Sequence, residues 1–462
     1  MASAWLSKFH SPEHQQYDGL VFWILKTEMP PRQRKQQTSE VAVPPTTSSS
    51  SRNAASPLDK LPFSSFANNG VLLPSGHRIT KRSLIASIPK YCFTRPIWKS
   101  FLFVGRDGLF IAAVVLAMRD AVLPFVASLS THLHPALAWV LPAVAWVAYA
   151  IVQGTVCTGP WVIGHECGHG AFSASTALND AVGFVIHSLL LVPYWSWQLT
   201  HAKHHKYTNH TTHGESHVPN LESEVVGFRA LAASLGEDAF SAVNVVQHLL
   251  FGWPAYIVFN ATGGRVNFRK EPLAEEGGGS ISHFIAPGSQ LYEPKQHAKV
   301  WLSTIGVVAM LGGLVMAARE YGALAVLQWY VGPYLVVNAW LVLYTWLQHT
   351  HEDIPHIGDD SYTWIRGALS TVDRPYPWIV DELHHHIGTT HVLHHLFSRV
   401  PHYHAQVASA AMKSELRGAY RHDPTPITVA TFQTATKCVY IDGTEGVQYF
   451  KDASGCASDI AL

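Results

Sequence analysis

Three groups of histidines in this chain have the spacing of metal ligands. The first is His165-Glu166-Cys167-Gly168-His169, the second is His201-Ala202-Lys203-His204-His205, and the third is His391-Val392-Leu393-His394-His395. Residues three and four apart lie on one face of an α-helix, so each group would present its imidazoles together. The third group repeats the spacing of the second, which argues against a chance arrangement.

The number of imidazoles favours two metal ions. A zinc ion takes about four ligands, so eight histidines exceed what one ion requires and suit two ions that each keep an open position. Imidazole binds zinc, copper, iron and nickel, and a ligand set without thiolates favours iron or copper in redox chemistry. The predicted ligands are His165, His169, His201, His204, His205, His391, His394 and His395.

Two other functions are compatible with these residues. The first group also fits the H-E-x-x-H pattern of zinc proteases, in which Glu166 would be the general base. That interpretation gives the second and third groups no role. A non-enzymatic metal transporter is the other alternative. It predicts histidines and carboxylates at mid-depth in membrane spans, whereas the three groups fall outside the long apolar segments.

Composition indicates that part of the chain lies in a membrane. Charged residues are 14% of the 462 residues, which is below the roughly 25% of ordinary soluble domains. Lysine plus arginine and aspartate plus glutamate number 32 each, so nothing in the charge balance suggests a nucleic-acid partner. The five cysteines form no C-x-x-C pair, which fits a reducing cytosolic face better than a disulfide framework.

The chain divides into three regions by composition. Residues 1–75 include a stretch rich in Ser, Thr and Pro and are expected to be disordered, without an apparent cleavable signal peptide. Residues 76–420 are predicted to form the membrane domain, and residues 421–462 a cytosolic tail. The flank at residues 75–100 is basic, so the positive-inside rule places it on the cytosolic side.

Four segments are predicted to span the membrane, because each is near the roughly 20 apolar residues that a spanning helix needs. They are residues 102–127, 136–157, 299–318 and 323–346. The first is the weakest, since Arg106-Asp107 and Arg119-Asp120 interrupt it and charges at depth are costly. Residues 181–197 and 243–259 are shorter apolar runs and are expected to be helices lying in the interface.

The position of the spans follows from the histidines, because ligands of one site must lie on one side of the membrane. If residues 181–197 crossed, the first two groups would be separated by the bilayer. The two spans between residues 299 and 346 return the chain to its starting side, so residues 243–259 must not cross either. The prediction is an all-α polytopic membrane protein with four transmembrane helices, interfacial helices, a cytosolic histidine cap and cytosolic termini.

The three histidine groups resemble, in kind, order and separation, the histidine boxes of membrane-bound fatty acid desaturases. The likeness is to the oleate delta-12 type of fungi and plants. Further stretches resemble the same family, namely residues 159–163, 188–194, 346–351, 371–374 and 401–404. Together the similar parts cover roughly residues 60–430.

The resemblance implies an enzyme of the endoplasmic reticulum membrane that converts oleoyl to linoleoyl chains of acyl lipids. It implies two iron ions, reduced by electrons from cytochrome b5 and its NADH-dependent reductase, and dioxygen as the oxidant that removes two hydrogens. Omega-3 desaturation, triple-bond formation and hydroxylation by the same family are alternatives. Gly164 bears on them, because the common oleate-type enzymes carry Ala before the first box.

The resemblance also implies roles for residues outside the three groups. Relatives use a ninth histidine ligand, for which His349 is the best match and His351 the second choice. His385 and Glu166 are expected to support or orient the ligands instead of binding metal. Histidines expected to be structural or solvated are His187, His210, His213, His217, His356, His402 and His404.

Overall fold

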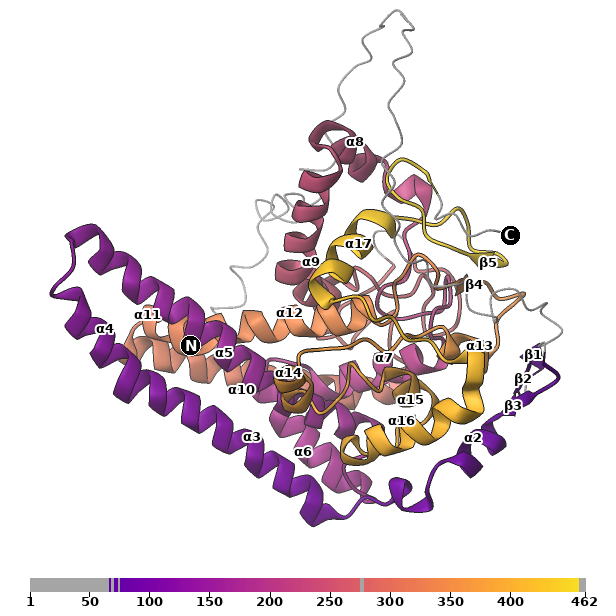
Figure 1. Ribbon diagram of the computed structural model, residues 1–462, viewed down its shortest axis with the longest axis horizontal. Coiled ribbons are helices and arrows are strands. Elements are labelled where there is room, and N and C mark those ends of the chain that lie inside the picture. Colours follow the sequence, from indigo (N-terminus) through magenta and orange to yellow (C-terminus); the bar gives the residue numbers. More distant parts are fainter. Residues whose placement is uncertain (1–65, 68–69, 74, 275–277, 457–462) are drawn as a thin grey trace, which may run out of the picture.

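The structure is mainly helical, as the sequence predicts. It is a computed structural model that describes residues 66–67, 70–73, 75–274 and 278–456. Most of residues 1–75, for which disorder is predicted, lie outside the described residues. Figure 1 shows long helices extending to one side and a cap of shorter helices and loops at their other end. The residues of all three histidine groups lie where these two parts meet.

Four long helical segments contain the four predicted spans. They are α3 (Ile97–Ala117) with a π-helical turn (Met118–Val122) and α4 (Leu123–Ser130); α5 (Pro135–His169); α10 (His297–Tyr321); and α11 (Ala323–Val326) with a second π-helical turn (Leu327–Val331) and α12 (Gly332–Leu347). Each is long and apolar enough to cross a membrane. In Figure 1 they run together, away from the cap.

A fifth helix passes the same test, so the predicted count of four spans is not confirmed. Among the described residues, α9 (Glu237–Phe259) is the fifth helix of sufficient length and hydropathy. Near its start, Ser241 Oγ lies 2.6 Å from Thr436 Oγ1, and just after its end the Val218 N–H donates to the Thr262 carbonyl at 3.1 Å. Both ends therefore contact the cap, and Figure 1 shows α9 running in a different direction from α3, α5 and α12.

A sharp bend separates two helices that lie between α5 and α9 in the chain. α6 (Thr176–Leu189) and α7 (Tyr194–Lys206) meet at 107°, and Pro193 directly precedes α7. The predicted interfacial segment, residues 181–197, contains this bend. Counted as one span, the pair would raise the number of candidate spans to six. The bend places the second histidine group, on α7, against the end of α5, which carries the first group.

Short elements form the cap, and the third histidine group lies on one of them. The helices are α2 (Lys81–Ser87), α8 (Val226–Leu235), α13 (Trp364–Leu369), α14 (Trp378–Leu383), α15 (His391–Leu396), α16 (His402–Leu416) and α17 (Ile427–Lys437). Strands β1 (Phe66–Ala67), β2 (Gly70–Leu72) and β3 (Arg78–Thr80) form an antiparallel sheet, and β4 (His356–Ile357) pairs antiparallel with β5 (Val447–Gln448). Apolar side chains of α15 are buried in a core shared with α2, α13 and α16, which fixes the third group.

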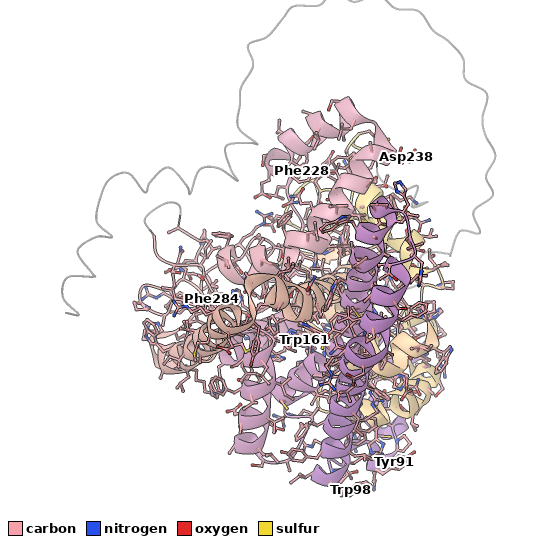
Figure 2. All side chains as sticks on the ribbon, turned by 90° about the vertical axis from the view of Figure 1, so that its left-hand side faces the viewer. Tyr91, Trp98, Trp161, Phe228, Asp238 and Phe284 are labelled. Atoms are coloured by element: carbon pink, nitrogen blue, oxygen red, sulfur yellow. The ribbon has the colours of Figure 1, made fainter. Side chains whose placement is uncertain are left out.

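Aromatic side chains distinguish the start of α3 from the interior of the molecule. Trp98 is 70% exposed, and Figure 2 shows it close to Tyr91 at one edge, whereas Trp161 of α5 is buried near the centre. Amphipathic aromatic rings favour the headgroup level of a membrane. The start of α3 therefore has the composition of a helix end at a membrane surface, as predicted from its basic flank.

Gly164, the residue that departs from the family pattern, is required by the packing of α5 against α6. A Cβ atom built on Gly164 would lie 2.3 Å from Cδ2 and 2.5 Å from Nε2 of His187. The His187 ring is completely buried and its Nε2 donates to the Trp161 carbonyl at 3.3 Å. His187 therefore has the structural role predicted for it, and its ring occupies the space that a side chain at position 164 would need.

Gly164→Ala should destabilise the protein through a steric conflict with His187. Overpacking of this kind costs about 1–3 kcal/mol, so we expect a lower unfolding temperature in detergent. The same substitution in a His187→Ala background should cost little, because the space is then free. Gly312→Ala is the matched control, since nothing lies within 4 Å of its Cβ position. Equal losses from Gly164→Ala in both backgrounds would contradict the steric explanation.

Candidate metal centre

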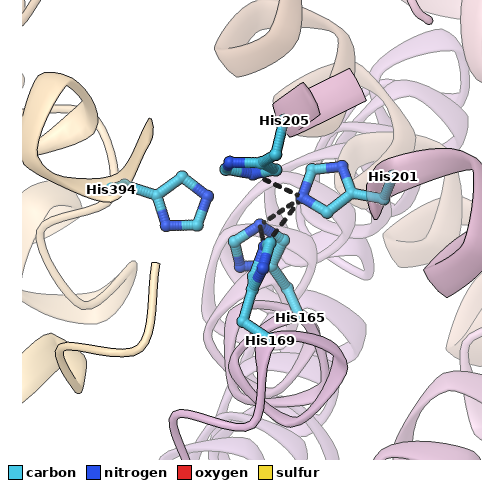
Figure 3. Close-up of side chains that lie close together, drawn as sticks. All are labelled: His165, His169, His201, His205 and His394. Atoms are coloured by element: carbon cyan, nitrogen blue, oxygen red, sulfur yellow. Dashed lines mark hydrogen bonds between the residues drawn. The ribbon is translucent and has the colours of Figure 1, made fainter. Parts of the chain in front are cut away.

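The first candidate metal-binding group combines histidines from three helices. His165 and His169 end α5, His201 and His205 lie on α7, and His394 lies on α15. One ligand nitrogen from each of these five lies within 4.8 Å of all the others. Figure 3 shows the five rings facing a common centre. The structure thus brings part of all three predicted groups together.

The nitrogen positions in this group fit a cation and do not fit an empty hydrogen-bond network. The Nε2 atoms of His165, His169 and His201 form a triangle with sides of 3.0, 3.0 and 3.3 Å. A nitrogen of a neutral imidazole either carries a proton or a lone pair. In any triangle of three such atoms, at least one contact must therefore join two donors or two acceptors. A metal ion that accepts the lone pairs removes this conflict.

The second group contains the four remaining histidines. Ligand nitrogens of His204, His349 and His395 lie within 4.8 Å of one another. His349 Nε2 is 3.2 Å from His204 Nε2 and 3.0 Å from His391 Nε2. His349 is the second residue after the end of α12, so it comes from a different element from the three boxes. Its alternative, His351, faces Asp353 and Asp423 instead, at 3.8 and 3.6 Å.

Hydrogen bonds on the far side of the rings orient three ligands of the second group. His349 Nδ1 lies 3.2 Å from Asn209 Oδ1, and His395 Nδ1 lies 3.0 Å from Thr208 Oγ1. His204 Nδ1 donates to the Glu215 carbonyl at 2.6 Å. An acceptor at Nδ1 keeps the proton there and leaves the Nε2 lone pair for a metal. Sequence reasoning missed Thr208 and Asn209, although they follow the second box closely.

Burial keeps the third box uncharged. It lowers the pKa of His391 to about 3, with a further contribution from His204. The pKa values of His394 and His395 are also held well below the ordinary value. Burial is the largest cause, and the neighbouring imidazoles are the next. Uncharged imidazole is the form that binds metal. These three residues are therefore ready to bind metal at neutral pH without losing a proton.

A buried carboxylate fixes the start of the third box. Asp373 Oδ1 accepts from the Val392 N–H at 2.8 Å, and its Oδ2 accepts from the Tyr420 hydroxyl at 2.7 Å. Burial raises the pKa of Asp373 to about 7. The Asp423 N–H also donates to the Asp373 carbonyl at 3.0 Å. Residues just beyond position 420 therefore help to hold the residue that orients α15.

Glu166 and His385, predicted to support the ligands, join neighbouring elements to the site. Glu166 accepts from the His402 N–H at 3.0 Å, so its carboxylate is directed to the start of α16. His385 donates to Asp107 Oδ2 at 2.8 Å. Neither contact reaches a ligand imidazole directly. The position of Glu166 also removes the geometric basis of the zinc protease alternative, which needs that carboxylate beside the metal-bound water.

A third cluster satisfies its polar atoms without a metal. His210, His213 and Asp359 lie within metal-ligand range of one another. However, His210 Nδ1 accepts from the N–H groups of Thr212 and His213, at 3.1 and 3.2 Å, which places its proton on Nε2. That proton is donated to Asp359 at 3.2 Å. The arrangement is the ordinary structural one expected for these histidines.

Comparison with known proteins identifies the family. The family model described as "Fatty acid desaturase" matches residues 137–425. The chain is 37% identical over 385 residues to the "Delta(12) fatty acid desaturase" of Mortierella alpina, covering 80% of this chain and 90% of that protein. It is 40% identical over 362 residues to the "Delta(12) fatty acid desaturase FAD2" of Calendula officinalis, covering 78% and 87%. It is 37% identical over 364 residues to the "Omega-6 fatty acid desaturase, endoplasmic reticulum" of Brassica juncea, covering 79% and 88%. The geometry of the nine histidines and these similarities agree, and the chain belongs to the fatty acid desaturase family.

Proposed function

We propose that this protein is an acyl-lipid delta-12 desaturase that converts oleoyl to linoleoyl chains. The observation that carries the proposal is the meeting of nine histidines, six buried and three half-buried, in two adjacent groups of a chain whose relatives are named for delta-12 desaturation. The reaction removes two hydrogens from a –CH2–CH2– unit. It consumes one dioxygen, two electrons and two protons, and it releases two waters.

Two iron ions are the proposed cofactor. His165, His169, His201, His205 and His394 would hold one ion, and His204, His349, His391 and His395 the other. When bound, iron supplies the redox chemistry needed to break an unactivated C–H bond with dioxygen, because an alkyl C–H has no useful acidity. The protein side chains hold these ions, keep the ligands uncharged and shield the site from water.

An apolar cavity next to both groups supports binding of an acyl chain. It lies between α7, α9 and α12, and His201 and His204 contribute to its wall. The rest of the wall combines apolar side chains, including Trp197, Trp253 and Val342, with polar ones from Ser216, His217, His248, Thr262 and Thr345. A methylene unit in this cavity would be close to a ligand from each metal group. We propose that the reacting part of the oleoyl chain lies here.

Electron delivery by cytochrome b5 and its NADH-dependent reductase is proposed to occur beside the second box. Lys206 follows the ligand His205 and is exposed, and its Nζ lies 5.1 Å from the ring centroid of Tyr207. The exposed Lys270 approaches the same ring at 5.9 Å. This basic surface suits an acidic electron-transfer partner, because complementary charge steers association.

The proposed location is the endoplasmic reticulum membrane, with the histidine groups, both termini and the tail at residues 421–462 on the cytosolic side. Four spans and an interfacial α9 satisfy the requirement that all ligands lie on one side. Contacts of both ends of α9 with the cap support that arrangement over a fifth span.

Expression in yeast, which supplies oleate and cytochrome b5, tests the function. We expect new linoleate by gas chromatography, and about two iron ions per purified chain, as in other two-metal sites. His391→Ala should remove the product because it removes a ligand. A chain that accumulates in the membrane and forms no linoleate would contradict the proposal. Linolenate from supplied linoleate, or an acetylenic or hydroxylated product, would redirect it within the family.

Val342→Phe should obstruct the acyl cavity. The larger ring fills space beside His201 and His204, and misplacing the reacting carbons should lower linoleate formation about tenfold. Fatty acid analysis at equal protein level measures the effect. Leu335→Phe is the matched control, because Leu335 lies on the same helix and faces outward. Unchanged conversion by Val342→Phe would place the acyl chain elsewhere.

Reversing the charge of the basic surface should weaken the electron donor without affecting the lipid. For Lys206→Glu combined with Lys270→Glu we expect the KM for cytochrome b5 to rise about tenfold and to depend less on salt. The KM for the acyl substrate should stay the same. Lys295→Glu is the control, since Lys295 is an exposed lysine that pairs with Glu293 on another part of the cap. An equal response in the control would argue against a specific docking surface.

A further inference from the structure

We infer that Asp107, His384 and His385 act together as positioning residues. They hold the third histidine box in position from the membrane side. We call these three residues the anchor. The inference rests on the proposed function, because it concerns the same metal centre. It assigns a role to a carboxylate inside the first candidate span and to two histidines outside the ligand set.

His384 connects three of the four segments that carry the predicted ligands, all of them except α7. Its Nε2 donates to the Thr155 carbonyl on α5 at 2.7 Å, and its Nδ1 accepts from the Tyr344 hydroxyl on α12 at 2.7 Å. Helix α5 ends in the first box, α12 leads to His349, and the segment after His384 leads to α15. The ring is completely buried, so both bonds are shielded from water.

His385 connects the same segment to the first span. Its Nε2 donates to Asp107 Oδ2 at 2.8 Å, and its Nδ1 lies 3.2 Å from a guanidinium nitrogen of Arg106. Arg106 also pairs with Asp107 Oδ1, at 3.0 Å, and with Glu382 Oε1, at 3.1 Å. Asp107 is only 2% exposed. A buried carboxylate of this kind is retained where partners satisfy it, and here the partners come from α3 and from the segment before α15.

The backbone of the segment is held in an unusual conformation. His385 and His386 have φ angles of 54° and 63°, in the left-handed region that residues other than glycine rarely adopt. Such conformations persist when the surroundings over-determine them. Gly159 of α5 permits the close approach, because a Cβ there would lie 2.6 Å from the Leu383 carbonyl oxygen. The contacts of the two imidazoles, from His384 to α5 and α12 and from His385 to α3, supply the restraint.

The segment passes this restraint on to the ligands. The Thr390 hydroxyl donates to the His386 carbonyl at 2.8 Å, and Thr390 directly precedes His391. The Gln348 amide donates to the Gly388 carbonyl at 2.6 Å, and Gln348 directly precedes His349. A shift of residues 384–390 would therefore move His349 and His391, whose Nε2 atoms are 3.0 Å apart. The anchor thus controls the geometry of the second metal group.

The chain contains its own control for Asp107. Arg119-Asp120 repeats the Arg-Asp sequence of Arg106-Asp107 in the same long helical segment. Asp120 bonds to its neighbour Arg119 at 2.7 Å, and both side chains are more than half exposed. Substitutions at Asp120 therefore remove a similar charge pair from the same span without touching the cap.

The test compares Asp107→Leu, Asp107→Asn and Asp120→Leu in purified full-length protein, measuring metal content by mass spectrometry and the Mössbauer spectrum of bound iron. Supporting residues around metal ligands change metal affinity about 10–100-fold, so Asp107→Leu should lose metal, show an altered spectrum and lose turnover. Asp107→Asn keeps an acceptor for His385 and should restore most of the metal. Asp120→Leu should match the unmodified chain.

His385→Phe provides a second variant if Asp107→Leu does not accumulate, because it keeps the ring contacts with Phe103 and His402 and removes both polar atoms. Metal content and spectra equal to those of Asp120→Leu, in Asp107→Leu or in His385→Phe, would overturn the inference. Failure of the proposed function is separate. An unmodified chain that binds metal but forms a different product leaves the metal readout of the anchor valid.

Discussion

Nine buried or half-buried imidazole rings that gather into two adjacent groups are the constraint on which this structure depends. Uncharged imidazoles cannot satisfy one another in that geometry, as the triangle formed by His165, His169 and His201 shows. Buried polar atoms without partners are costly. Metal binding would remove that cost, and part of its free energy would then be free energy of folding for the cap. The cap and the metal centre are therefore one unit physically.

The constraint explains why the ends of elements far apart in the chain lie close together in space. The predicted ligands come from the end of α5, from α7, from the residue pair after α12 and from α15, and all must lie at the same depth to share one site. The bend before α7 and the contacts of Asp373 with α15 serve this purpose. The apolar cores of the cap hold the outer faces of these elements, while the polar contacts orient the rings. Stability and chemistry thus use different faces of the same short helices.

The sequence predicted the parts of this arrangement that depend on local spacing. Box histidines three and four residues apart need only a helix to share a face, and apolar length alone locates the long helices. Composition alone could not decide the position of α9, because a 23-residue apolar helix has the same composition across a membrane or along it, and only the requirement of a one-sided metal site predicted that it does not cross. His349 entered only through family resemblance, since a single histidine after a span has no distinctive spacing. Asp107 counted as a weakness of the first span, because its partner His385 is 278 residues away.

Gly164 shows how a departure from a family pattern is interpreted once its surroundings are known. A change next to a box could alter the reaction, and the sequence alone leaves that alternative open. In the structure the space of the missing methyl group is occupied by the ring of His187. Trp161 stacks on both His187 and His165, with ring centroids 5.6 and 5.5 Å apart, so the filled space supports the ligand from behind. The glycine and the histidine compensate for each other in volume. The departure at this position is therefore explained by packing between α5 and α6, and it gives no independent reason to assign a triple-bond or hydroxylated product.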